Sequence, residues 1–154
     1  MKTIIYSAIL FFLFSCNSNT SESTSNEQQK FSNNDEIVNS VKGANGKYFL
    51  DQTTVGNIHR FENTVLNFRD ISKKRSPKID IYNEFSIIIS RNVEEISSQC
   101  KMNGEGHEVL KNILNKISEQ NKTISGTDLE QAKLAFKNIC NLTNQINSDF
   151  DYSN

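Results

Sequence analysis

The residues of this chain that could do chemistry together lie in one short segment, from Cys100 to His107. Cys100, Met102 and His107 offer a thiol, a thioether and an imidazole, and Gly104 and Gly106 lie between the last two. These are soft ligands that suit Cu(I), or Zn²⁺ if a carboxylate joins them. The segment therefore predicts a copper or zinc site.

A purely structural interpretation of the same residues stays open. Glycine-rich connections between helices are common, methionine fills gaps in a core, and a cysteine on an apolar helical stripe is usually a small hydrophobe. The chain has two histidines and no nucleophile elbow, phosphate-binding loop or paired-carboxylate pattern, so nothing in it suggests an enzyme. A Cys-x-x-Cys-His sequence for covalent haem is also missing, and the alternatives are therefore no cofactor or a copper or zinc ion.

Four amphipathic segments must position these residues. Apolar side chains recur at spacings of three and four from Val55 to Lys73, from Ile81 to Cys100, from His107 to Ile117 and from Leu129 to Phe150. The connections between them are short, as is typical of antiparallel neighbours. This pattern predicts an all-α domain over residues 35–154, an up-down-up-down four-helix bundle.

The bundle topology makes a prediction about the site. The first and third helices start at the end of the bundle where the second and fourth helices finish. His59 would therefore join Cys100, Met102 and His107, with Asp149 and Asp151 nearby. These four residues, His59 included, are the candidate metal ligands.

Capping residues predict where two of the helices begin. Ser76 can cap the second helix with Pro77 as its first residue, because proline has a fixed φ and lacks an N–H. Thr127 followed by Glu130 resembles a capping box before the fourth helix.

The segment before the first long helix carries weaker signals. Residues 35–41 could form a short helix with acidic residues in its first turn. Residues 43–46 read Gly-Ala-Asn-Gly and predict a turn. Tyr48, Phe49 and Leu50 are expected to pack this segment onto the domain.

The first residues predict export. Lys2 precedes an apolar run over residues 4–14, which has the length of a signal-peptide core and is too short to span a bilayer. The run ends in Leu13-Phe14-Ser15-Cys16, which resembles the lipobox of bacterial lipoproteins. The resemblance implies that residues 1–15 are a signal peptide, and that Cys16 becomes the first residue and carries lipid, palmitate included, as a membrane anchor.

A tether is expected between this anchor and the helices. Residues 17–30 contain no apolar side chain, so residues 16–34 cannot bury enough surface to order themselves. A flexible chain of this length holds a domain on the order of 20–25 Å from the membrane. Asn17 rather than Asp follows the anchor; by resemblance to lipoprotein sorting rules, this implies the outer membrane, facing the periplasm.

The charge of the chain is nearly balanced. It has 17 Lys and Arg against 18 Asp and Glu, so losing Lys2 leaves 16 against 18, a formal charge of −2. Such a chain has no general attraction for nucleic acid. The basic cluster near the end of the first helix is typical of a solvated helix end; it comprises Arg69, Lys73, Lys74, Arg75 and Lys78.

Two thiols remain once Cys16 carries lipid. Cys100 and Cys140 would lie in a compartment that permits disulfides. Cys140 lies well before the end of its helix, an axial offset of ~15 Å from Cys100 at the rise of an α-helix. A disulfide needs Cα atoms within ~7 Å, so the offset counts against the bond, although uncertain helix ends leave it open.

The stretch from Cys100 to Leu110 is similar to a segment of small uncharacterised exported helical proteins, which carry Cys-x-Met-x-Gly-x-x-His before an apolar helix. That resemblance implies no particular activity.

The sequence as a whole leaves two functional hypotheses. The chain is a lipid-anchored interaction module that binds an envelope protein as adaptor, inhibitor or immunity factor, or it is an envelope protein that binds copper or zinc.

Overall fold

The computed structural model describes residues 37–152. The predicted signal peptide, the lipidated Cys16 and the tether up to residue 34 lie outside these residues. The described part is mostly helical, as predicted, with four helices of 20 to 23 residues and strands of only two residues each. Within it, no helix combines the length and the apolar character needed to cross a membrane.

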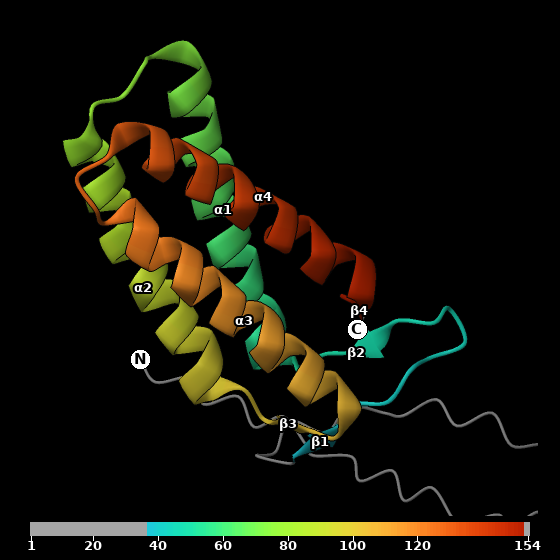
Figure 1. Ribbon diagram of the computed structural model, residues 1–154. Coiled ribbons are helices and arrows are strands. Elements are labelled where there is room, and N and C mark those ends of the chain that lie inside the picture. Colours follow the sequence, from blue (N-terminus) through green and yellow to red (C-terminus); the bar gives the residue numbers. More distant parts are fainter. Residues whose placement is uncertain (1–36, 153–154) are drawn as a thin grey trace, which may run out of the picture. The chain divides into compact units, whose positions relative to one another are not determined.

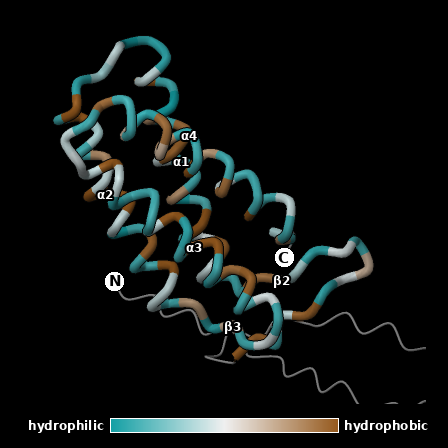
Figure 2. Tube along the Cα trace, viewed as in Figure 1, coloured by the Kyte–Doolittle hydropathy of each residue, from teal (hydrophilic) through white to brown (hydrophobic). Residues whose placement is uncertain are grey.

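The four helices follow one another along the chain with short connections (Figure 1). Their bounds are Gln52–Lys74 for α1, Ile79–Gln99 for α2, Glu105–Ile124 for α3 and Leu129–Asp149 for α4. Each helix packs against the next one in sequence, and α4 also contacts α1 and α2. Hydrophobic residues recur along each helix (Figure 2), and most of the large ones are buried, which is why the spacing of apolar residues predicted all four helices.

The predicted starts of α2 and α4 are wrong by one or two residues. Lys78 is the N-cap of α2, and Pro77 lies before the helix with its ring buried. Asp128 rather than Thr127 caps α4, and its side chain accepts hydrogen bonds from the backbone N–H groups of Glu130 and Gln131 at 2.8 and 3.1 Å. A carboxylate one residue closer to the helix competes successfully with a threonine hydroxyl for these donors.

Aromatic side chains fill the core where α1, α2 and α4 meet. The rings of Phe68 and Phe85 stack at 4.0 Å between centroids. Phe136 contacts both edge-on, at 4.8 and 5.3 Å, and Tyr82 packs against Phe68 at 5.0 Å. These four side chains form a continuous buried aromatic cluster.

Two pairs of very short strands hold the segment before α1. Val38–Asn39 (β1) pairs in parallel with Met102–Asn103 (β3) in the connection between α2 and α3. Tyr48–Phe49 (β2) pairs in parallel with Phe150–Asp151 (β4) after α4. Tyr48 and Leu50 are buried, as predicted.

The predicted helix over residues 35–41 is wrong in its described part. The N–H of Val38 donates to the carbonyl of Lys101 at 2.8 Å, and that of Ser40 donates to the carbonyl of Asn103 at 3.0 Å. The backbone of this segment thus finds its partners in another part of the chain rather than within itself. The turn over residues 43–46 is confirmed by the hydrogen bond from Gly46 N to Gly43 O, at 2.9 Å.

Gly106, in the first turn of α3, allows the closest approach between this segment and the helices. A Cβ atom there would lie 2.1 Å from the Oγ of Ser40, and that hydroxyl is held by donating to the carbonyl of Phe49 at 2.6 Å. We therefore expect Gly106→Ala to lower the free energy of unfolding by ~1–3 kcal/mol through overpacking, measured by urea denaturation.

The matched control is Gly56→Ala in α1. A Cβ atom at this exposed position meets nothing within 4 Å. Alanine is the better helix former, so this change should raise the free energy of unfolding by ~0.5–1 kcal/mol. If both variants were stabilised alike, Gly106 would not mark a tight contact.

Candidate functional site

Cys100 and His107 come together across the connection between α2 and α3. Their Sγ and Nδ1 atoms lie 3.6 Å apart. Cys100 is the C-cap of α2, where its N–H donates to the carbonyl of Ile96 at 3.1 Å. His107 lies in the first turn of α3. Both side chains are half-buried, so they remain accessible to a small ligand.

Three features fix the path of the connection between them. The pairing of β3 with β1 holds Met102 and Asn103. Gly104, the N-cap of α3, has φ +81°, and a Cβ atom there would lie 2.6 Å from the Oδ1 of Asn39. The carboxylate of Asp51 accepts a hydrogen bond from the N–H of Lys101 at 3.1 Å. Gly104 and Gly106 thus let the segment before α1 approach this connection.

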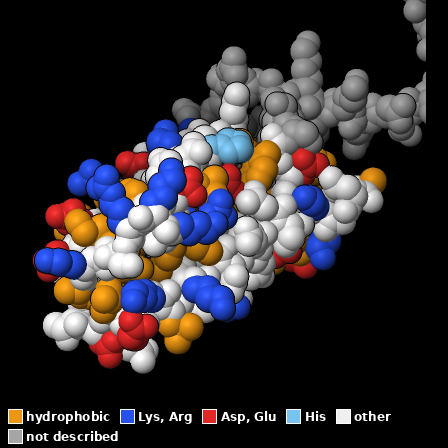
Figure 3. All heavy atoms as spheres, turned by 90° about the horizontal axis from the view of Figure 1, so that it is seen from above, with side chains coloured by type: hydrophobic (Ala, Val, Ile, Leu, Met, Phe, Trp, Pro, Cys, Tyr) orange, Lys and Arg blue, Asp and Glu red, His pale blue; other side chains and the backbone are white. Residues whose placement is uncertain are grey.

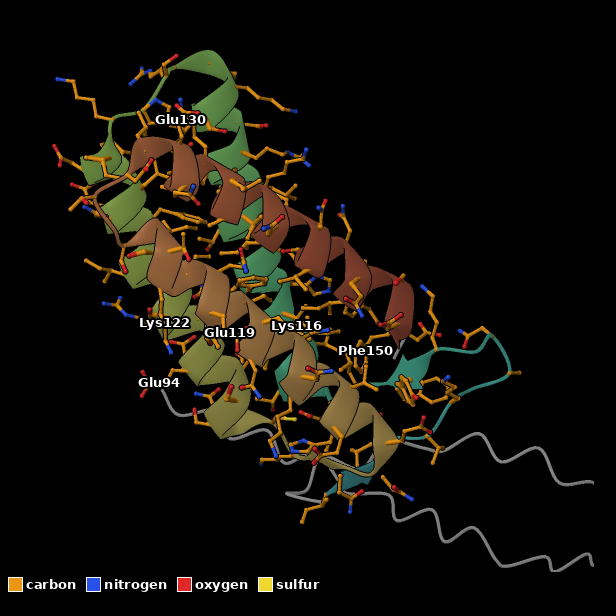
Figure 4. The ribbon with its side chains drawn as sticks, viewed as in Figure 1. Glu94, Lys116, Glu119, Lys122, Glu130 and Phe150 are labelled. Carbon is orange, nitrogen blue, oxygen red and sulfur yellow. The ribbon has the colours of Figure 1, made fainter. Side chains whose placement is uncertain are left out.

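The thiol and the imidazole face a pocket with a volume of about 280 Å³. Its wall is formed by residues from the end of α2 and from successive turns of α3: Ser97, Cys100, His107, Leu110, Lys111, Leu114 and Asn115. Leu110 and Leu114 are buried and make part of the wall apolar. Farther along α3, the charged side chains of Lys116, Glu119 and Lys122 are exposed to solvent (Figure 4).

The other two predicted ligands do not line this pocket. Met102 is buried within the hydrophobic core, because the two-residue strand β3 turns Met102 inward and leaves Asn103 exposed. His59 is exposed on α1, where its Nδ1 lies 3.4 Å from a carboxylate oxygen of Glu62. Among the residues that the structure describes, no group of three or more His, Cys, Asp and Glu side chains could hold a metal ion.

His59 belongs instead to a cluster that the sequence analysis did not predict. Its ring packs at 5.1 Å from the ring of Tyr152, whose hydroxyl donates to Glu62 at 3.1 Å. Burial raises the pKa of Tyr152 well above its usual value, and the negative charge of Glu62 raises it further. Asp149 and Asp151 were expected near the metal. Their carboxylates accept hydrogen bonds from the side-chain amides of Gln145 and Asn45, respectively.

The raised pKa of Tyr152 predicts a pH dependence. The folded protein holds the neutral phenol, so its stabilising effect is complete below the pKa of the unfolded chain, about 10, and declines as the pH rises above it. We expect the free energy of unfolding to fall more steeply between pH 9 and 11 in the wild type than in Tyr152→Phe. Parallel pH profiles from chemical denaturation would contradict this.

Cys100 and Cys140 are both free thiols, so the disulfide left open by the sequence is not formed. Cys140 lies on α4, four residues after Phe136 and far along the helix from its C-terminal end. Burial raises the pKa of the Cys140 thiol, and the positive charge of Arg69 opposes this effect only in part. Cys140 is therefore protonated at neutral pH.

Several residues that line the pocket were not predicted from the sequence. Lys111 lies one helical turn after His107, so the helical period alone could have placed it on the same face. Nothing comparable in the sequence points to Ser97 or Asn115. A thiol and an imidazole at the edge of an open pocket can bind a borderline cation or share a proton.

The chain matches no family model, no curated protein and no solved structure.

Proposed function

We propose that this chain is a lipid-anchored protein of the bacterial cell envelope whose up-down-up-down four-helix bundle binds another envelope protein. The bundle follows a tether from Cys16, and the protein faces the periplasm from the outer membrane. Support for the anchor comes from the short apolar run, the Leu13-Phe14-Ser15-Cys16 sequence and the polar stretch that follows. The proposal includes neither catalysis nor nucleic-acid binding.

The observation that carries the interaction role is the exposed apolar side of α2. Ile81, Ile87 and Ile88 are 39%, 63% and 47% exposed. Ile81 and Ile88 are seven residues apart, so they lie on the same side of the helix two turns from each other. Side chains at this spacing are the usual anchors when a helix binds a groove in another protein.

The neighbouring helix also carries an exposed apolar side chain near its end. Ile71 of α1 is also exposed, and α1 packs against α2. On the face that Figure 3 shows, hydrophobic side chains lie among those of Lys and Arg. Grouped apolar side chains are more typical of a protein-binding surface than scattered ones.

Photo-crosslinking in the producing cell tests the interaction role. A photoreactive residue in place of Ile88 should give one reproducible adduct, and Ile81→Glu should remove it. The control carries the photoreactive residue in place of Leu134 on α4, which is similarly exposed at 55%, and it should not give this adduct. The same adducts from both positions would contradict a binding surface on α2.

The anchor has its own test. Cys16→Ser should abolish incorporation of labelled palmitate and release the protein from the membrane fraction, because the lipidated thiol is gone. Cys140→Ser is the control and should leave both unchanged. Density-gradient separation of the two membranes tests the outer-membrane position. Labelled Cys16→Ser protein would show that another residue carries the lipid.

A further inference from the structure

We propose that Cys100 is a modification site, at which a small disulfide that carries carboxylates forms a mixed disulfide with the cysteine sulfur. The proposal goes beyond the interaction role, since neither the anchor nor the α2 surface depends on it. Only the supply of such disulfides rests on export of the chain, because disulfides persist outside the reducing cytosol. The site consists of Cys100, His107, Lys111 and the pocket that they line.

The nucleophile and its base already lie side by side. The Sγ of Cys100 and the Nδ1 of His107 are 3.6 Å apart, within hydrogen-bond distance for sulfur. A cysteine attacks as the thiolate, and an adjacent base takes up the proton as the thiolate forms. Cys100 ends α2 and His107 lies in the first turn of α3. Both are therefore held by helices rather than by a free loop, which keeps the pair in place.

The pocket gives the attacked disulfide a place to bind. Its volume is about 280 Å³, and Leu110 and Leu114 form an apolar part of its wall. These side chains can contact the methylene groups of a small molecule. Pockets for drug-sized ligands begin at ~300 Å³, so this one suits a smaller molecule. The pocket therefore favours a low-molecular-weight disulfide over one held within a folded protein.

The polar part of the wall favours a negatively charged ligand. Lys111 contributes an ammonium group, Ser97 and Asn115 contribute hydrogen-bond donors, and none of the residues that line the pocket is acidic. The carboxylate of Glu108 lies 3.7 Å from the Lys111 ammonium, but both side chains are more than half exposed. Such an exposed pair contributes little, so the ammonium remains available to a carboxylate of the ligand.

The reaction is a thiol–disulfide exchange, and its atoms and electrons balance. The Cys100 proton passes to Nδ1 of His107, which carries its own proton on Nε2, and the sulfur attacks one sulfur of the small disulfide. A new S–S bond forms on Cys100, the S–S bond of the small disulfide breaks, and the departing thiolate takes the proton from His107. Cys100 is oxidised and half of the small disulfide is reduced to a thiol. The product is a reversible cap, unlike sulfinic or sulfonic acid.

The chain contains its own control thiol. Cys140 does not line this pocket. Burial raises the pKa of the Cys140 thiol, and the positive charge of Arg69 opposes this effect only in part. Because the thiolate is the attacking form, Cys140 should react with the same disulfide more slowly than Cys100.

Two probes of similar size test the proposal on the full-length protein in detergent. Dithiodipropionate carries two carboxylates, and cystamine carries two ammonium groups. Each rate is read by mass spectrometry of the peptide that contains the cysteine, and is divided by the rate for the same cysteine in urea. With dithiodipropionate, the normalised rate of Cys100 should be at least tenfold that of Cys140. The normalised rate of Cys100 should also be higher with dithiodipropionate than with cystamine.

Substitutions separate the two supporting roles. His107→Ala should slow labelling of Cys100 at least tenfold with both probes, because the proton acceptor is gone, whereas the control His59→Ala should not. Lys111→Gln should reduce the preference for dithiodipropionate about threefold, the size expected of one exposed charge pair. Its control is Lys116→Gln, at an exposed position on the same helix outside the pocket, which should leave the preference unchanged.

The wild type alone can overturn the proposal, so it stays testable if a variant folds poorly. Equal normalised rates for Cys100 and Cys140, or a preference of Cys100 for cystamine, would do so. Unchanged labelling of Cys100 in His107→Ala would also overturn it, because the imidazole would then not act as the base. None of these outcomes bears on the crosslinking test of the α2 surface.

Discussion

Phe136→Ala should lower the free energy of unfolding by ~3–5 kcal/mol, the cost of removing a buried phenylalanine. Phe136 is 6% exposed and its ring contacts those of Phe68 and Phe85 edge-on. The side chain comes from α4, whereas its partners come from α1 and α2, so the cavity would open at the junction of three helices. Urea denaturation followed by circular dichroism measures the change.

The control for this prediction lies two residues away on the same helix. Leu134 is 55% exposed, so Leu134→Ala removes a large apolar side chain without opening a cavity. Its effect should stay within ~0.5 kcal/mol, as is usual for surface substitutions. Similar losses for both variants would show that the aromatic cluster does not hold α4 against α1 and α2.

Asp51→Ala should lower the free energy of unfolding by ~2–3 kcal/mol, more than the usual loss of an N-cap. The Asp51 carboxylate is 5% exposed. It accepts hydrogen bonds from the N–H of Thr54 at 2.9 Å, from the Thr54 hydroxyl at 2.5 Å and from the N–H of Lys101 at 3.1 Å. One side chain thus both caps α1 and holds the connection beside Cys100, and its removal takes the acceptor away from the buried N–H and hydroxyl of Thr54.

Asp128→Ala separates these two roles. Asp128 caps α4 with the same chemistry, but it is exposed, and its side chain accepts hydrogen bonds from the N–H groups of Glu130 and Gln131 in the first turn of its own helix. We expect a loss of ~1 kcal/mol, typical of an N-cap. The excess loss in Asp51→Ala then reflects the features that Asp128 lacks: the burial of the carboxylate and its bonds to the Thr54 hydroxyl and to the N–H of Lys101. Equal losses in the two variants would show that these features add nothing to capping.

The helices could be predicted from the sequence because each has a long apolar stripe with a regular period. The buried residues of these stripes recur at helical spacing, and burial of such a stripe outweighs weak local preferences. The two-residue strands could not be predicted, because two residues show no period. Residues 38–40 carry no sign that their backbone partners lie more than sixty positions later, at Lys101 and Asn103.

The same difference between local and long-range contacts explains which parts of the candidate site could be predicted from the sequence. Cys100 and His107 flank a short connection between adjacent helices, so their approach follows from local chain geometry. The position of Met102 depends on which face of β3 turns inward, which is decided by its pairing with a distant segment. The side chain of His59 contacts Glu62, one turn later on α1, and Tyr152, near the end of the described residues. Its position therefore depends in part on a residue distant in sequence.

The pairing of β2 with β4 has a consequence for the order in which the protein can fold. Tyr48 pairs with Phe150, and the side chain of Asn45 donates to Asp151 at 2.6 Å, so these contacts close the described chain almost end to end. Helices form from local contacts quickly, whereas contacts this distant in sequence form late. A chain made residue by residue on a ribosome therefore lacks this closure until Phe150 and Asp151 have been added.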